Sequence, residues 1–204
     1  MRSYSDSEEE SLTGEESDGL EIPDTFTDEE ESDRIEERQQ DVLPEDEALS
    51  PWKRALGGLY LEHKSVFDNP RYYDQETGAI HWPGQGRDVN TDGFLNGQYE
   101  ETNLPAGMII DRYGGNNGTF FAEDGLSIEE RAMAPNSDFS TYNRYEVKKS
   151  IPVRAGIIAP WFDQPGGGIQ YQLDPEFVQN IRGQLHTGEA LIDGLIRLGY
   201  LKRL

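Results

Sequence analysis

The stretch GMIIDRYGGNNGTFFA, residues 107–122, decides how this chain folds. Its two ends, GMIIDRY and TFFA, are short runs of β-branched and aromatic residues, which favour strands, and the glycines and asparagines between them favour a turn. Three similar runs follow, separated by glycine, proline or asparagine: YNRYEVKK, VRAGIIA and GIQYQL, which begin at residues 142, 153 and 168. The sequence therefore predicts a small, mostly antiparallel β-sheet.

The C-terminal part of the chain changes to a helical pattern. Asp174 can cap a helix whose first residue is Pro175. Apolar side chains then recur on one face, at Phe177, Val178 and Ile181. A second helix is expected after Thr187, with apolar side chains at helical spacing and a glycine that can end it: Leu191, Ile192, Leu195, Leu198 and Gly199. We predict an α+β fold in which short helices flank the sheet.

The first fifty residues differ in composition from the rest. They hold twenty acidic and three basic residues, whereas residues 51–204 hold twenty acidic and fifteen basic ones. The apolar residues of the first segment are too sparse to bury a core, so nothing would offset the conformational entropy lost on ordering its backbone. We predict a disordered acidic tail over residues 1–50 and one globular domain over residues 51–204. The tail could keep the chain soluble, mimic nucleic acid or cover a basic ligand groove.

Composition also narrows the classes of function. A net charge of −22 argues against nucleic acid as a partner, because phosphates bind basic surfaces. No apolar run reaches the length of a membrane span, and no signal-peptide pattern is visible. We therefore expect no membrane partner and a soluble protein that is cytoplasmic or is delivered to a target cell by a non-classical route. The chain has no cysteine, and His63, His81 and His186 fit no zinc motif, so no metal site is predicted.

Two segments, about fifty residues apart, each place one polar side chain among glycines and aromatics. They are DRYGGNNGTFF, residues 111–121, with Arg112, and PWFDQPGGGIQY, residues 160–171, with Gln170. These surroundings suit a flat, anionic ligand. A guanidinium pairs with phosphate through two parallel hydrogen bonds, and a neutral amide can hold a hydroxyl or a water. A structural ion pair for Arg112 and a flexible turn for the glycines are the alternatives.

An ordered set of motifs from about residue 80 to residue 204 resembles the tuberculosis necrotizing toxin family. It begins with Thr91-Asp92-Gly93-Phe94 and Leu104-Pro105-Ala106-Gly107, continues through both segments, and ends with Gly199-Tyr200-Leu201. The resemblance implies an NAD+ glycohydrolase that converts NAD+, and also NADP+, to nicotinamide and ADP-ribose and acts as a toxin by depleting the dinucleotide. It implies NAD+ as substrate rather than cofactor, and a cognate immunity protein as partner.

The resemblance also assigns roles to residues. Arg112 falls on the family's functional arginine and is expected to hold the pyrophosphate, and Gln170 falls on its glutamine and is expected to act at the reacting ribose. Phe120 lies where some members have a tyrosine, so it can stack or pack but offers no hydroxyl. The predicted substrate-binding residues are Tyr113, Phe120, Arg131, Trp161, Gly167, Gly168 and Tyr171. Core packing of the aromatics and a structural ion pair of Arg131 remain open.

One difference from the family and two alternative functions qualify the predicted activity. Where some family members supply a functional histidine, this chain has Asn136-Ser137-Asp138-Phe139-Ser140-Thr141. A protein ADP-ribosyltransferase would use the same pocket, but the glycine-rich segment lacks the glutamate that such enzymes often place near the reacting ribose. A catalytically inactive dinucleotide-binding module would bind the ligand without turnover.

Overall fold

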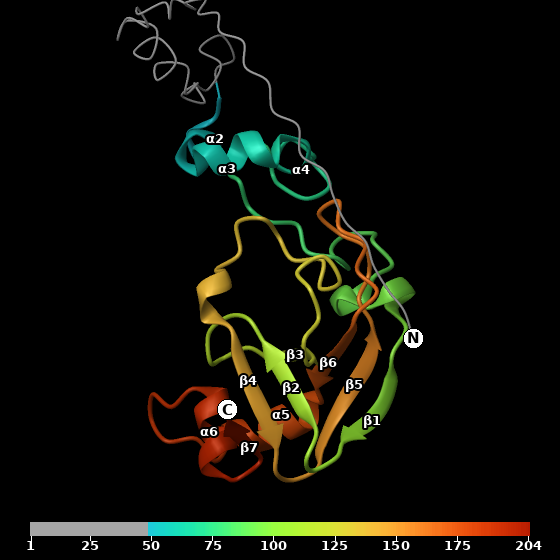
Figure 1. Cartoon of the computed structure of the whole chain (residues 1–204), viewed down its shortest axis with the longest axis vertical. Helices are drawn as coiled ribbons and strands as arrows, with labels where there is room; N and C mark the ends of the chain where they lie inside the picture. Colours follow the sequence, from blue (N-terminus) through green and yellow to red (C-terminus); the bar gives the residue numbers. More distant parts are fainter. Residues whose placement is uncertain (1–48) are drawn as a thin grey trace, which may run out of the picture. The chain divides into compact units, whose positions relative to one another are not determined.

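The structure is a computed structural model, and it describes residues 49–204 of the chain (Figure 1). The acidic tail predicted for residues 1–50 lies outside the described residues, except for its last two. The division of the chain at residue 50 therefore stays a prediction.

A seven-stranded antiparallel sheet forms the centre of the described part (Figure 1). Along the sheet the strands follow the order β1-β5-β6-β3-β2-β4-β7, and each neighbouring pair is antiparallel. The strands are β1 Glu100–Leu104, β2 Ile109–Arg112, β3 Phe120–Glu123, β4 Asn143–Val147, β5 Ile151–Ile157, β6 Ile169–Leu173 and β7 Leu201–Arg203. The predicted antiparallel sheet and α+β class are confirmed.

The five runs predicted as strands form β2 to β6. The two edge strands, β1 and β7, show no strand pattern in the sequence. Four of the five residues of β1 are exposed, and β7 has only three residues, of which one is buried. An edge strand with so few buried side chains has no alternation of apolar and polar residues to read.

Helices α5 (Pro175–Arg182) and α6 (Leu191–Arg197) pack against the sheet as predicted. The side chain of Asp174 accepts a hydrogen bond from the Phe177 N–H at 2.9 Å, which caps the start of α5. Gly199 follows α6 with a φ of +76°, the left-handed conformation expected of it. Their apolar faces join the sheet in one core, which includes Ile110, Phe121, Tyr145, Leu173, Ile181, Leu191, Ile192 and Leu195.

Residues 49–100 pack as short elements and loops over a second, largely aromatic core. They contain the short helices α2 Pro51–Leu56, α3 Gly58–Glu62 and α4 Lys64–Phe67 and the 3-10 helices η1 Thr91–Gly93 and η2 Leu95–Gly97; η3 Phe139–Thr141 follows later. The second core includes Tyr60, Phe67, Tyr72, Tyr73, Trp161 and Phe162. Trp161 and Phe162 come from the connection between β5 and β6, so they join this core to the sheet. None of the helices within residues 49–204 is long and apolar enough to cross a membrane.

Candidate active site

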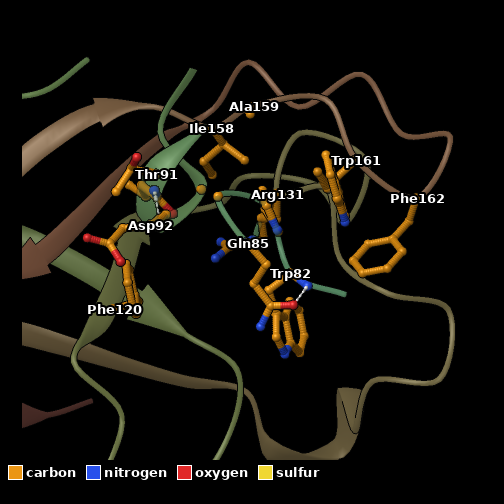
Figure 2. Close-up of a pocket in the computed structure, with 15 residues that line it drawn as sticks. Trp82, Gln85, Thr91, Asp92, Phe120, Arg131, Ile158, Ala159, Trp161 and Phe162 are labelled. Carbon is orange, nitrogen blue, oxygen red and sulfur yellow. Dashed lines mark hydrogen bonds between the residues drawn. The ribbon is translucent and has the colours of Figure 1, made fainter. Parts of the chain in front are cut away.

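A pocket of about 580 Å³ opens over one face of the sheet (Figure 2). Strands β3 and β6, the η1 helix, the loop that precedes η1 and the connection between β5 and β6 form its walls. Its polar and aromatic lining residues are Trp82, Gln85, Thr91, Asp92, Phe120, Arg131, Trp161, Phe162 and Gln170. Figure 2 shows Asp92 and Phe120 on one side of the pocket, Trp161 and Phe162 on the other, and Arg131 between them.

Gln170 lies on β6 at the end of the pocket that holds Asp92. It pairs across the sheet with Ala122 of β3, and Ala122 pairs with Asp111 of β2, so these three side chains share one face. The side-chain Nε2 donates to the backbone carbonyl of Asp92 at 3.0 Å. Within the described part of the chain, Oε1 makes no hydrogen bond. The amide is thus fixed at one atom and can accept a hydrogen bond from a ligand or a water at the other.

The glycines before Gln170 form an ordered turn rather than a flexible linker. Gly167 has a φ of +91°, which side chains rarely adopt, and its N–H donates to the Ile158 carbonyl at 2.9 Å. The Gly168 N–H donates to the Glu130 carbonyl at 3.1 Å. A Cβ at Gly168 would collide with the side chain of Leu126. Gly167 and Gly168 do not line the pocket, so they support the segment that carries Gln170 without facing the cavity.

Arg131 reaches the pocket from the loop after β3 and is held there by a buried carboxylate. Its Nη2 lies 2.6 Å from Oδ1 and 2.8 Å from Oδ2 of Asp111 and donates to the latter. Its Nε donates to the Leu126 carbonyl at 2.9 Å. Asp111 is fully buried and also accepts from Tyr142 at 2.7 Å and from the Gly125 N–H at 3.0 Å. The hydrogen bonds to Asp111 all reach Oδ2, while Oδ1 contacts the guanidinium only as an ion-pair partner. The ion pair fixes the guanidinium, whose Nη1 makes no hydrogen bond with any described residue.

Two tyrosines support the ion pair. The guanidinium carbon of Arg131 lies 5.4 Å from the ring centroid of Tyr113, and the Tyr113 ring packs on Tyr142 with centroids 4.9 Å apart. Burial, and next the hydrogen bond to Asp111, raise the pKa of Tyr142 to about 12. Tyr113 does not line the pocket. The structure thus places this predicted substrate-binding residue behind Arg131.

Arg112 lies on the other face of the sheet and does not line the pocket. Its Nη1 donates to the Gly118 carbonyl at 3.1 Å and its Nη2 to the Tyr113 carbonyl at 3.4 Å. Its guanidinium carbon lies 5.6 Å from the ring centroid of Phe121, a core residue. Burial lowers the pKa of Arg112, and it forms no ion pair with a described residue. Arg112 and Gln170, which the sequence assigns to one site, are not brought together.

The other three predicted aromatics, Phe120, Trp161 and Tyr171, differ in position. Phe120 is 38% exposed and lines the pocket on the side of Asp92. Trp161 is 3% exposed, lines the opposite side, and donates its Nε1 to the His81 carbonyl at 2.8 Å. Tyr171 belongs to the core between the sheet and the helices, and burial raises its pKa. Core packing, the alternative left open, thus describes Tyr171, whereas Phe120 and Trp161 can contact a ligand.

Residues 136–141, where the resemblance implies a histidine in some family members, are held in the scaffold by hydrogen bonds. Asn136 accepts a hydrogen bond from the Tyr73 hydroxyl at 2.8 Å, and Thr141 Oγ1 accepts from the Gly114 N–H at 2.8 Å. Of the described residues that line the pocket, none is a histidine. Nor do His, Asp and Glu side chains within residues 49–204 gather into a group that could hold a metal ion.

Several pocket residues that lie outside the sheet were not predicted from the sequence. Asp92 carries the carbonyl that fixes Gln170, and its motif Thr91–Phe94 is a signal that could have found it. Its φ of +55° is a conformation that aspartate tolerates better than most residues. The side chain of Trp82 is 48% exposed where it lines the pocket. The backbone N–H of Trp82 donates a hydrogen bond to Gln85 Oε1 at 3.0 Å. Nothing local in the sequence marks Trp82 or Gln85 as site residues.

Comparison with known proteins gives the family of the chain. The family model described as tuberculosis necrotizing toxin matches residues 103–204, half of the chain. The chain belongs to the tuberculosis necrotizing toxin family. The matched range includes Arg112, Arg131 and Gln170 but not Trp82, Gln85 or Asp92. The toxin-family match therefore covers the strands of the pocket and the connection between β5 and β6, but not the segment of residues 82–93.

One relative is the conidial surface nicotinamide adenine dinucleotide glycohydrolase of Aspergillus fumigatus. It is 38% identical over 109 residues, which are 50% of this chain and 40% of the relative, so the chain spans less than half of that protein. The solved structure of tuberculosis necrotizing toxin complexed with its immunity factor is 21% identical, with a TM-score of 0.41 over 70% of this chain and 82% of that one. Rhs1-CT in complex with its cognate immunity protein is 21% identical, with a TM-score of 0.35 over 46% of this chain and 80% of that one.

Proposed function

We propose that the chain is a glycohydrolase that cleaves NAD+, and also NADP+, to nicotinamide and ADP-ribose. The observation that carries the proposal is Gln170, held on the pocket wall through Nε2 while Oε1 can accept a hydrogen bond. Membership of the tuberculosis necrotizing toxin family and the named activity of the Aspergillus relative support it.

The proposed reaction needs little general acid–base catalysis by the protein. The bond between C1′ of the ribose and N1 of nicotinamide breaks, and its electron pair leaves with the nitrogen. Nicotinamide departs as a neutral molecule, so it needs no general acid, unlike the poor leaving group of most glycosides. A water oxygen then bonds to C1′ and its proton passes to solvent. The protein has to position the ribose, stabilise its positive charge and orient the water.

The Gln170 end of the pocket meets these needs. The Oε1 atom of Gln170 can accept a hydrogen bond from the water or from a ribose hydroxyl. The carboxylate of Asp92, on the same side of the pocket, can stabilise the developing positive charge of the ribose. Phe120 offers a partly exposed ring face to the nicotinamide. No metal or cofactor is needed in this scheme.

Arg131 suits the pyrophosphate, because it lies between the two ends of the pocket. Its partner Asp111 balances its charge, so it would hold the ligand through hydrogen bonds from a fixed guanidinium rather than through net charge. The pyrophosphate role assigned to Arg112 by the resemblance stays a prediction, and the position of that residue outside the pocket gives it no support.

In the proposed function the chain depletes its dinucleotide substrate and so acts as a toxin. An immunity protein, which the family resemblance implies, would stop it by covering the mouth of this pocket. Both statements stay predictions. The exposed ring of Trp82 beside the mouth is the first surface to test for such a partner.

Incubation of the purified chain with NAD+, followed by chromatography, tests the function directly. Nicotinamide and ADP-ribose should appear together, and Gln170→Ala should lower the rate by about a hundredfold. Gln172→Ala is the matched control, because Gln172 lies on the same strand and the same face but does not line the pocket. Both variants should keep the melting temperature of the wild-type chain.

Other outcomes would identify the alternatives. Label from NAD+ that appears on protein instead of in free ADP-ribose would indicate an ADP-ribosyltransferase. Binding of NAD+ without release of nicotinamide would indicate an inactive binding module. A wild-type rate no higher than that of Gln170→Ala would contradict the proposal.

A further inference from the structure

A second pocket, of about 350 Å³, adjoins the first. The two pockets share Trp82, Gln85 and Trp161, so they lie side by side, and an elongated ligand that extends over these residues would reach both. The second pocket adds three side chains that can be charged: Arg71, His81 and Asp88. None of the site residues expected from the sequence, other than Trp161, lies there.

Arg71 is positioned by its contact with the shared wall. Its guanidinium carbon lies 4.3 Å from the ring centroid of Trp161, a distance typical of a cation stacked on an indole. The indole is itself buried and hydrogen-bonded to the His81 carbonyl, so the platform is rigid. Stacking occupies the face of the guanidinium and leaves its N–H edge available for a planar or tetrahedral anion.

Arg71 forms no ion pair with any residue in the described part of the chain. Asp88, in the same pocket, is already engaged: its oxygens accept from the Gly84 N–H at 2.7 Å and from the Asn90 side chain at 3.1 Å. Arg131, the arginine of the first pocket, is neutralised by Asp111. Arg71 is therefore the lining arginine that is not engaged in an ion pair with a described residue.

The order of groups along the two pockets identifies the ligand atom that Arg71 would meet. If the reacting ribose lies at Gln170 and the pyrophosphate at Arg131, the adenosine end lies at Trp161, next to the second pocket. NADP+ differs from NAD+ by a phosphate on the 2′-oxygen of this adenosine. We infer that the second pocket takes this 2′-phosphate and that Arg71 binds it, which makes Arg71 the residue that favours NADP+ over NAD+. The inference rests on the proposed function for the direction of the ligand.

Steady-state hydrolysis of NADP+ and NAD+ by the full chain tests the inference. Arg71→Gln should lower kcat/KM for NADP+ by about ten- to a hundredfold, because it removes a charged hydrogen bond to the phosphate. It should leave kcat/KM for NAD+ within about twofold of wild type. Arg87→Gln is the matched control, since Arg87 is an exposed arginine nearby that lines neither pocket. It should leave the ratio of the two substrates unchanged.

An equal loss for both substrates would overturn the inference, because Arg71 would then contact a group that NAD+ and NADP+ share, or support the fold. An unchanged ratio would overturn it as well. Calorimetry gives a test that needs no hydrolysis: adenosine 2′-monophosphate should bind the wild-type chain more tightly than adenosine does, and Arg71→Gln should abolish the difference. If the wild-type chain released nicotinamide from neither dinucleotide, the proposed function would fail, while this binding test would still decide the role of Arg71.

Discussion

The two faces of the sheet hold a buried arginine in different ways. On the face that packs against α5 and α6, Arg112 donates to two backbone carbonyls and lies over Phe121. On the face that carries the pocket, Arg131 is paired with the buried carboxylate of Asp111. Asp111 and Arg112 are neighbours in sequence, and strand alternation sends them to opposite faces. One short motif therefore contributes to two separate structures.

The partners of each arginine indicate what it does. Carbonyls do not balance a positive charge as a carboxylate does, and burial accordingly lowers the pKa of Arg112. Arg112 orders the loop between β2 and β3, and this loop meets α6, where the Ile192 N–H donates to the Asn116 carbonyl at 2.8 Å. Arg131 is charge-balanced and ends in the pocket. From this difference we expect Arg112 to belong to the scaffold and Arg131 to the site.

The largest effect is expected from removal of the carboxylate that holds Arg131. Asp111→Ala should lower the free energy of unfolding by about 3–5 kcal/mol, because it leaves a buried guanidinium without its partner. Urea denaturation measures the loss. Asp111→Asn should keep part of the hydrogen bonding and so part of the stability, but it should raise KM for NAD+, since the guanidinium is no longer fixed.

The ion pair between Asp124 and Arg144 is the control for this prediction. It lies on the surface, with side chains 28% and 46% exposed. Asp124→Ala should cost no more than about 1 kcal/mol, as is usual for exposed pairs. If Asp111→Ala cost as little as Asp124→Ala, the Asp111 pair would not be the buried anchor of the site.

A smaller effect is expected on the other face, at Gly118. A Cβ at this position would lie 2.8 Å from the guanidinium carbon of Arg112, which is buried and has little room to move. Gly118→Ala should therefore lower the free energy of unfolding by about 1–3 kcal/mol. Gly115→Ala, in the same loop, meets nothing within 4 Å and should change it by less than about 0.5 kcal/mol.

The same variant tests the comparison through activity. If Arg112 belongs to the scaffold, folded Gly118→Ala should bind and cleave NAD+ as the wild-type chain does. A loss of activity at unchanged stability would instead support the substrate-binding role of Arg112 that the family resemblance implies.

The sequence predicts the interior of the fold better than its edges. Strands β2 to β6 and helices α5 and α6 bury apolar residues at regular spacing, and Asp174 and Gly199 mark helix ends through local chemistry. Strands β1 and β7 and helices α2 to α4 lack such signals. The short helices depend on contacts between distant residues, such as Trp52 stacked on Tyr73 with ring centroids 5.8 Å apart. Local patterns do not contain such pairings.

The candidate site was predictable where strands with a clear sequence pattern carry it. Gln170 and Phe120 lie among glycines and aromatics that mark the sheet wall, and the alternation of Asp111 and Arg112 follows from a strand. Which face carries the pocket is a tertiary property, decided by where the helices pack. The pairing of Asp111 with Arg131, twenty residues away, is likewise fixed by a loop whose course no local pattern gives.

The smallest effect is expected at the rim of the ion pair, at Tyr142. Tyr142→Phe removes a hydrogen bond to Asp111 and should lower the free energy of unfolding by about 1 kcal/mol at neutral pH. The pKa of Tyr142 is raised from 10.0 to about 12, so the folded state holds the phenol proton more tightly than the unfolded state. The contribution of the protonated Tyr142 phenol to the free energy of unfolding is therefore complete below pH 10 and disappears as the pH rises through 12. Urea denaturation of both proteins should show a stability difference that is constant up to pH 10 and then shrinks. Tyr99→Phe is the control, because this ring is similarly exposed but its hydroxyl makes no hydrogen bond with a described residue, and it should change the free energy of unfolding at neutral pH by less than about 0.5 kcal/mol. If the stability difference between the wild-type chain and Tyr142→Phe persisted undiminished to pH 12, the phenol would not donate to the Asp111 carboxylate. The pocket face would then lack one of the hydrogen bonds that distinguish it from the face that holds Arg112.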